Sequence, residues 1–249
     1  MTGSNNDDNN NLEIFADKIK TVQAADVIWV ELADFSAQFG IDALSYYHMA
    51  PPGSKDFSEK HFTAIGFDQK AADEHRRNHR HFSSPFTSRA NPLTEPLFWG
   101  EVFEKLILTD EEKARLEAFY CFNGETNGLV LPVFGPNGRN GCVAFRFMNP
   151  DVAFTRDNVH MVGLAAYLAH LQFCRIRAKE SGEIVNLTRR EKEVLTWVAR
   201  GKSNSVIADI VGISQHTVNG YLRRIYLKTG TSDRTSAAVR AIGDSLIDY

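Results

Sequence analysis

Residues 187–249 constrain the fold of this chain more than any other part. Within residues 203–228 the apolar side chains recur at helical spacing in two short runs, one on each side of Gly212. Glycine suits the left-handed end of a first helix, and Ser214 is placed to cap a second helix through its hydroxyl. Helix, short glycine-containing turn and capped helix together predict a helix-turn-helix motif.

The second of these helices has a polar face that suits recognition of bases. Asn219 and Arg223 lie about one turn apart on this face, and their side chains match the edges of adenine and guanine in the major groove. His216 and Gly220 share the face, and we expect all four residues to contact bases. The hydroxyl and basic residues expected to contact phosphates are Lys202, Ser203, Ser214, Thr217, Arg224, Lys228 and Arg234. The alternative is a small helical bundle with a solvated polar face.

A characteristic set of residues is spread along residues 187–228. They are Leu187, Thr188, Arg190, Glu191, Glu193, Val194, Leu195, Ala199, Gly201, Lys202, Ser203, Asn204, Ile207, Ala208, Ile213, Ser214, Thr217, Val218, Ile225 and Lys228. In this pattern the stretch resembles the LuxR-type DNA-binding domain. The resemblance implies a four-helix domain that binds double-stranded DNA as a homodimer, with its frame held by Glu191, Leu195 and Gly201.

Two positions depart from the family pattern. Tyr221 stands where the family usually has a histidine, and Gly220 lies within a helix, where it costs about 1 kcal/mol relative to alanine. The glycine either allows a close approach to the groove or contacts nothing.

Charge is unevenly distributed along the chain. Residues 187–249 contain ten Lys or Arg and six Asp or Glu, a net charge of +4, whereas the whole chain of 249 residues carries −3. The first 186 residues therefore carry −7. This asymmetry favours a basic reader of nucleic acid joined to a domain with a different task.

Composition also indicates the compartment. Cys121, Cys142 and Cys174 are scattered and form no CxxC pair, which favours reduced thiols over a disulfide framework. No apolar run approaches the ~20 residues of a membrane span, and the polar, acidic N-terminus is the reverse of a signal peptide. We expect a cytoplasmic protein with no membrane partner, in which residues 1–11 form a disordered tail.

Residues 12–174 carry the pattern of an α/β domain. The predicted order is a segment with helix-spaced apolar residues, two strands, a polar helix, two further helices, a hairpin and a long closing helix. The corresponding ranges are 11–39, 41–49, 62–66, 69–80, 102–107, 109–119, 128–134 with 141–147, and 154–173. A charged linker, residues 175–186, follows. We predict an α/β/α sandwich with a mostly antiparallel sheet, followed by an all-α four-helix helix-turn-helix domain.

Pro85, Trp99 and the Gly128-Leu-x-x-Pro132 stretch stand at a characteristic spacing in this domain. With them the domain resembles the autoinducer-binding domain that usually precedes the LuxR-type DNA-binding domain. That resemblance implies a bound N-acyl-homoserine lactone, held in the family by a Trp, a Tyr and an Asp.

This chain has Ala71, His75 and Ser84 at the three anchor positions. Because a hydrogen bond to a charged group contributes ~1.5–3 kcal/mol, loss of the carboxylate argues against a lactone held in the family's way. Two interpretations follow. The domain senses a different or lactone-like small molecule, or it needs no ligand and serves only dimerisation or binding of another protein.

The expected pocket contains the changed anchors and aromatic residues. Its candidates are Trp99, His75, Ser84, Phe82, Ala71, Tyr46, Phe67, Phe86, Phe98 and Phe103. Trp99 and Phe82 are the strongest, because they flank a Pro- and Ser-rich stretch that could cover a cavity. The alternative for each aromatic residue is the plain hydrophobic core.

Catalytic and metal sites are not expected. His75 and His79 have the spacing of a zinc site, but neighbouring arginines would repel a cation and no further ligand stands nearby. Ser83 or Ser84 could be drawn into a triad with His75 and Asp73, yet no nucleophile-elbow glycines flank the serines. The sequence therefore predicts no enzyme, no metal and no cofactor beyond a signal ligand.

Overall fold

The computed structural model describes residues 4–58, 61–77, 94–101, 107–114, 117, 127–147, 155–180 and 185–247. The chain divides into two compact units: Met1–Met49 with His61–Lys179, and Ala50–Lys60 with Glu180–Tyr249. The predicted boundaries placed residues 50–60 in the first domain, whereas this segment groups with the second unit.

Five antiparallel strands form a sheet at the centre of the described part of the first unit, which confirms the predicted antiparallel arrangement. Its strands are β1 (Ile41–Met49), β2 (Phe62–Ile65), β3 (Leu97–Phe98), β4 (Gly128–Val133) and β5 (Asn140–Phe147), in the order β2-β1-β5-β4-β3. The β4–β5 hairpin turns through Asn137 and Gly138, with φ of 59° and 72°. Left-handed residues at a tight turn explain why the Gly-Pro-Asn-Gly signal predicted this hairpin.

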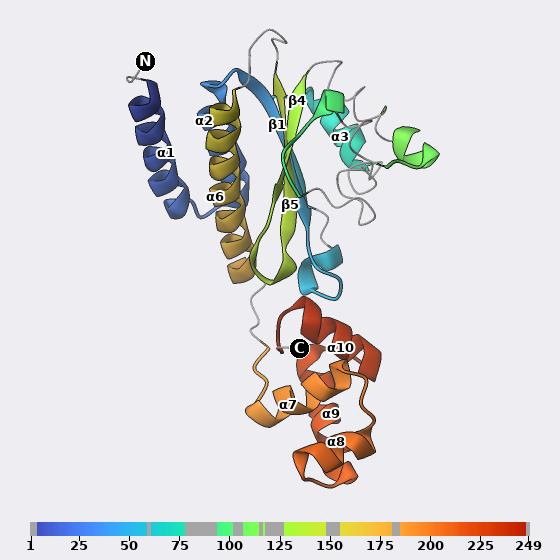
Figure 1. Ribbon diagram of the computed structural model, residues 1–249. Helices are drawn as coiled ribbons and strands as arrows, with labels where there is room; N and C mark the ends of the chain where they lie inside the picture. Colours follow the sequence, from blue (N-terminus) through green and yellow to red (C-terminus); the bar gives the residue numbers. More distant parts are fainter. Residues whose placement is uncertain are drawn as a thin grey trace. The chain divides into compact units, whose positions relative to one another are not determined.

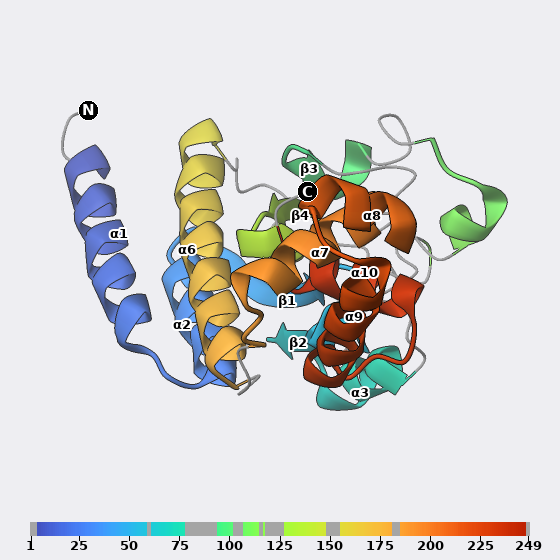
Figure 2. The same ribbon diagram turned by 90° about the horizontal axis from the view of Figure 1, so that it is seen from below.

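Helices cover both faces of the sheet (Figure 1). On one face lie α1 (Ser4–Thr21), α2 (Ala25–Ala37) and α6 (Arg156–Glu180), and Figure 2 again shows α2 and α6 side by side. Trp29, Tyr46 and Phe173 are among the fully buried side chains of the core between this layer and the sheet. Helix α3 (Gln69–Arg77) lies on the opposite face.

Two helix ends differ from the sequence prediction. Residues 4–11, predicted to be disordered, form the first half of α1. Phe15 and Ile19 anchor this helix in the core, so the polar residues before them continue a helix that is already fixed by packing. Helix α6 likewise extends to Glu180 rather than ending before residue 175, because Ile176 is buried in the same core.

Among the described residues after 185, the second unit contains four α-helices, which confirms the predicted all-α domain. They are α7 (Arg189–Ala199), α8 (Asn204–Val211), α9 (Gln215–Thr229) and α10 (Arg234–Gly243). Thr188, Ser203, Ser214 and Asp233 each cap the next helix by accepting a backbone N–H. Among the described residues of either unit, no helix is both long and apolar enough to cross a membrane.

Candidate nucleic-acid interface and ligand-binding face

The α8–α9 pair has the geometry of a helix-turn-helix motif. Gly212 ends α8 in the left-handed conformation, with φ of 70°, and its N–H donates to Ala208 O at 2.9 Å. Two residues later, Ser214 Oγ accepts the Thr217 N–H at 3.0 Å and starts α9. The turn is short because glycine reverses the chain without strain and serine caps the next helix at once.

Helix α9 has one buried and one exposed side. Val218 and Ile225 are fully buried in the core of the second unit. His216, Asn219 and Arg223 are exposed. A Cβ atom added at Gly220 would meet no atom of the described residues within 4 Å. Packing against the described residues therefore does not require a glycine at this position.

Asn219 is held by a neighbouring helix. Its Oδ1 accepts a hydrogen bond from Asn204 Nδ2 at 2.7 Å. Asn204 in turn accepts from Arg234 Nη1 at 3.0 Å, and Arg234 Nη2 donates to the carbonyl oxygen of Lys202. The sequence predicts a phosphate contact for Arg234 and indicates no role in recognition for Asn204. No local sequence pattern could have indicated these linked hydrogen bonds, because Asn204 lies 15 residues from Asn219 and 30 residues from Arg234.

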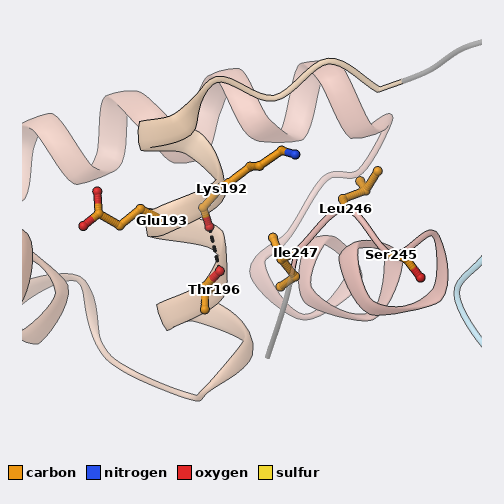
Figure 3. Close-up of a pocket in the computed structure, with 6 residues that line it drawn as sticks. All are labelled: Lys192, Glu193, Thr196, Ser245, Leu246 and Ile247. Atoms are coloured by element: carbon orange, nitrogen blue, oxygen red, sulfur yellow. Dashed lines mark hydrogen bonds between the residues drawn. The ribbon is translucent and has the colours of Figure 1, made fainter. Parts of the chain in front are cut away.

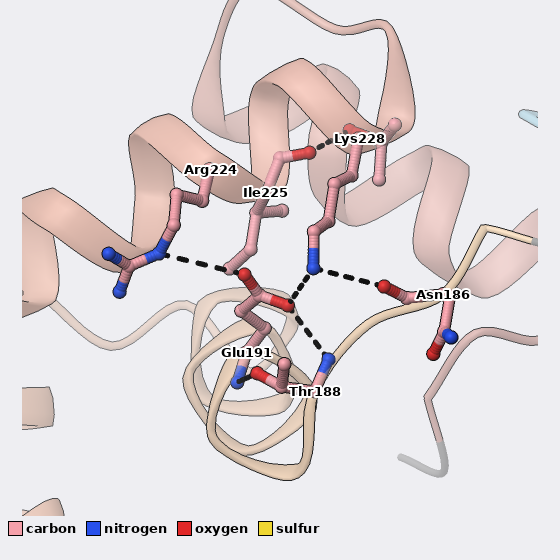
Figure 4. Close-up of polar contacts among 7 residues, drawn as sticks. Asn186, Thr188, Glu191, Arg224, Ile225 and Lys228 are labelled. Atoms are coloured by element: carbon pink, nitrogen blue, oxygen red, sulfur yellow. Dashed lines mark hydrogen bonds and ion pairs between the residues drawn. The ribbon is translucent and has the colours of Figure 1, made fainter.

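Glu191 is the centre of a second polar cluster (Figure 4). Its carboxylate is 2 % exposed and accepts from Lys228 Nζ at 2.7 Å and from the Thr188 backbone N–H at 2.7 Å. Arg224 Nε lies 3.7 Å from the other carboxylate oxygen. Burial alone would raise the pKa of Glu191, but the hydrogen bonds from Lys228 and Thr188 outweigh it and lower this pKa below its usual value.

These contacts give Lys228 and Arg224 an internal partner that the sequence did not indicate. Lys228 also donates to the Asn186 carbonyl oxygen at 3.0 Å, so its ammonium joins α9 to the segment before α7. The Arg224 guanidinium lies 4.7 Å from the centre of the Tyr221 ring. Leu195 is fully buried, and Gly201 adopts φ of 75° after α7.

The remaining candidate phosphate contacts lie at the starts of α8 and α9. Lys202, Ser203, Ser214 and Thr217 are exposed. Ser203 Oγ caps α8, and the hydroxyls of Ser214 and Thr217 lie 2.8 Å apart at the start of α9. Helix N-termini carry a partial positive charge and unpaired backbone N–H groups, which suits a phosphate.

In the first unit, Trp99 lies on an apolar face of the sheet. It packs with Tyr47, Phe62 and four further buried side chains in a cluster separate from the main core, and it is 2 % exposed. Gly128 makes this position possible, because a Cβ there would lie 2.2 Å from the indole ring. Burial raises the pKa of Cys142 in the same cluster to about 12, so its thiol stays protonated.

The structure does not bring all the predicted pocket residues together. Tyr46 belongs to the core on the other face of the sheet, where its ring stacks on Trp29 at 3.7 Å between centroids. Phe98 packs against that same core, and Phe67 lies under the Arg146 guanidinium at 4.8 Å. Assigning Tyr46 and Phe98 to one pocket with Trp99 was therefore wrong. Adjacent residues of a strand point to opposite faces.

The other pocket candidates lie outside the described residues, or their side chains do. Phe82, Ser84, Phe86 and Phe103 are outside the described residues. Ala71 and His75 are within helix α3, but their side chains are not described.

A buried polar network that no sequence pattern indicates lies between the sheet and α6. Tyr46 Oη lies 2.8 Å from His170 Nδ1 and 3.2 Å from His48 Nδ1. His170 Nε2 donates to the carbonyl oxygen of Arg139 at 2.9 Å, which joins α6 to the β4–β5 turn. Burial lowers the pKa of His170 to about 4, so the imidazole is neutral at pH 7. The network ties β1 to α6.

A small pocket lies in the second unit (Figure 3). Lys192, Glu193 and Thr196 of α7 line it on one side, and Ser245, Leu246 and Ile247 after α10 line it on the other. Its volume of about 180 Å³ is below the ~300 Å³ of ordinary small-molecule sites. We assign it no ligand.

Known protein families match parts of both units. The family described as "Bacterial regulatory proteins, luxR family" matches residues 185–241, and the family described as "Autoinducer binding domain" matches residues 24–173. This chain belongs to the LuxR family of regulators. Its first unit is an autoinducer-binding domain and its second contains a LuxR-type helix-turn-helix domain.

Several LuxR-type relatives are similar to this chain. The transcriptional activator AhyR of Aeromonas hydrophila is 26 % identical over 175 residues, which cover 68 % of this chain and 67 % of AhyR. The quorum sensing-dependent regulator VjbR of Brucella ovis is 34 % identical over 125 residues, 48 % of this chain and 47 % of VjbR. The aligned parts thus span between about half and two thirds of these LuxR-type relatives. Both relatives are regulators rather than enzymes.

A solved structure shows the same fold. SdiA of Escherichia coli matches with a TM-score of 0.71 over 96 % of this chain and 98 % of SdiA, at 19 % identity. A second structure of SdiA, in complex with octanoyl-rac-glycerol, matches with a TM-score of 0.70 at 18 % identity over 96 % of each chain. At this identity the likeness concerns the fold alone.

Proposed function

We propose that this LuxR-family protein regulates transcription by binding double-stranded DNA as a homodimer, with α9 of each subunit in the major groove. The observation that supports this most directly is that α9 has a buried side and an exposed side. One side is buried in the core, and the other presents Asn219 and Arg223, whose side chains suit base edges. His216 lies on the same exposed side, and Gly220 leaves room there for a close approach of the DNA.

Phosphate contacts in this proposal come from the helix starts. Lys202 supplies a charge, and the capped N-termini of α8 and α9 offer Ser203, Ser214 and Thr217. Arg224 is half exposed and supplies a further charge near the groove. We assign Lys228 and Arg234 primarily to the frame, since both donate hydrogen bonds within the unit.

The homodimer is proposed to form through α6. Leu164 and Tyr167 stand one turn apart on this helix and are 47 % and 40 % exposed, although a surface helix normally presents polar side chains to water. A second copy of the chain would cover this stripe. Leu164→Arg should therefore convert the dimer to a monomer in sedimentation, and it should weaken DNA binding steeply.

The first domain is proposed to sense a small molecule on the Trp99 face of the sheet. The face is apolar, and the match to the autoinducer-binding domain favours sensing over a domain used only for dimerisation. Because Ala71, His75 and Ser84 replace the expected anchors, we propose a ligand other than a lactone held in the usual way. SdiA holds octanoyl-rac-glycerol, whose head group is a polyol and not a lactone.

Two measurements test this function. Full-length protein is mixed with a library of randomised duplexes, and the bound fraction is sequenced. The proposal predicts a two-fold symmetric motif, and failure to enrich any sequence at a salt concentration that suppresses non-specific binding would refute it. Mass spectrometry of the purified protein, together with thermal shifts against acyl lactones and acylglycerols, tests the sensing role. A rise of several degrees with one class identifies the ligand, and no shift with full DNA binding would favour the ligand-independent alternative.

A further inference from the structure

A chain of hydrogen bonds from three helices ends at the recognition face of α9. It begins at Arg234, the first residue of α10, whose Nη1 donates to Oδ1 of Asn204 at 3.0 Å. Asn204, the first residue of α8, donates from Nδ2 to Oδ1 of Asn219 at 2.7 Å. The other terminal nitrogen of Arg234 donates to the Lys202 carbonyl oxygen, so the guanidinium is held at two points.

Arg234 determines which atoms donate and which accept in the hydrogen bonds from Arg234 to Asn204 and from Asn204 to Asn219. A guanidinium has N–H donors and no acceptor, so the Asn204 atom that faces Arg234 must be its carbonyl oxygen. The amide nitrogen of Asn204 then faces Asn219, where it needs an acceptor. Asn219 therefore turns its Oδ1 toward Asn204, and its NH₂ group is the part of the amide left for another partner.

We infer that Asn204 determines specificity by fixing the amide of Asn219 so that N–H donors face the DNA. The inference rests on the proposed role of Asn219 as a base reader. Donors match the major-groove acceptors of purines, N7 and guanine O6, and thymine O4, whereas cytosine presents only its amino group there. The base read by Asn219 is therefore one with an acceptor edge. A bidentate contact to adenine would have to use the second lone pair of Oδ1, an oxygen that already accepts from Asn204, so the NH₂ group is the more available part of the amide.

One substitution should reverse the amide. In Asn204→Asp both side-chain oxygens are acceptors, so one still accepts from Arg234 and the other now requires a donor from Asn219. Asn219 would turn its NH₂ group inward and present Oδ1 to the DNA. An aspartate in the first turn of α8 is compatible with the helix dipole, so this variant is expected to fold.

The experiment selects duplexes from a randomised library with four full-length proteins: the wild type, Asn204→Asp, Asn219→Ala and Ser205→Asp. Ser205 is exposed and adjacent to Asn204, so Ser205→Asp adds the same charge without touching Asn219. Bound sequences are ranked at one salt concentration, since added charge weakens binding to every duplex alike. Thermal unfolding of each variant shows that it is folded.

At one position of the motif the wild type should enrich bases with an acceptor edge by about fivefold or more, the discrimination that one hydrogen bond provides. Asn204→Asp should shift that position toward cytosine, which presents only an amino group in the major groove and so matches an oxygen. Asn219→Ala should erase the preference, and Ser205→Asp should leave it in place.

Two results would overturn the inference in different ways. If Asn219→Ala erased the preference but Asn204→Asp kept the wild-type base, Asn219 would read DNA without guidance from Asn204. If Asn219→Ala left the whole motif unchanged, Asn219 would not be a base reader, and that part of the proposed function would fall as well.

Discussion

The ammonium of Lys228 lies 2.7 Å from the carboxylate of Glu191, 37 residues earlier in the chain. The carboxylate is buried and Lys228 is about one third exposed. The pair fastens α9 to the start of α7, so the helix proposed to enter the groove is fixed by the same residue that completes the α7 capping box.

Lys228→Ala should destabilise the second unit by about 2–3 kcal/mol, because it leaves a buried carboxylate without its closest cation. Hydrogen exchange of peptides from α7 and α9, followed by mass spectrometry, measures this local stability. Lys202→Ala is the matched control, because it removes a lysine whose side chain is exposed, and it should change exchange by less than ~0.5 kcal/mol. Equal protection in both variants would mean that the ion pair contributes nothing.

The same pair makes the second unit sensitive to acid. The pKa of Glu191 is lowered in the folded state, so the carboxylate contributes stability above its unfolded pKa of about 4.3. That contribution is lost as the pH falls through the lower folded value. Exchange protection of α7 and α9 should therefore fall between about pH 5 and pH 3 in the wild type. In Glu191→Gln the fall over this window should be smaller, and an identical pH profile would contradict the assignment.

Gly220→Ala should stabilise α9 by about 1 kcal/mol, because alanine is the better helix former and its Cβ meets no described atom. If the glycine serves close approach to the groove, as proposed, the same variant binds the selected duplex more weakly. Hydrogen exchange of α9 and titration of the duplex give the two values. Higher stability with unchanged affinity would show that DNA does not approach this position.

In the first unit, Gly128→Ala should destabilise by about 1–3 kcal/mol, since the new methyl group would collide with Trp99. Gly163→Ala on α6 is the control. There the nearest described atom, on Leu131, is 3.9 Å from the added Cβ, and the helix gains from alanine. Denaturant unfolding of the two variants should give shifts of opposite sign. A tolerated Gly128→Ala would mean that Trp99 can move away from β4.

Features that depend on neighbouring residues could be predicted from the sequence. Ser214 and Gly212 are examples, because a cap and a left-handed turn involve atoms within a few residues. The assignment of Lys228 to phosphate shows the limit of such reasoning. A basic residue on a helix looks the same in sequence whether it meets DNA or a buried carboxylate of another helix.

Strand β1 explains the error at Tyr46. Most of its residues are buried, so it lacks the alternation of polar and apolar side chains that would assign each one to a face. Tyr46 and Tyr47 are adjacent and similar, yet one lies in the core with α2 and α6 and the other with Trp99. Residues 4–11 were missed for a related reason: composition predicts disorder, but Phe15 and Ile19 fix the helix from inside the core.

The central claim is that α9 reads bases while the starts of the helices hold phosphates. The most direct measurement is the salt dependence of binding for Arg223→Ala and Lys202→Ala, on the selected duplex and on a scrambled one. Arg223→Ala should cost about 1–3 kcal/mol on the selected duplex and little on the scrambled one, whereas Lys202→Ala should weaken both and reduce the salt slope by about one. If Arg223→Ala weakened both duplexes equally and changed the slope as Lys202→Ala does, α9 would not be the reading element.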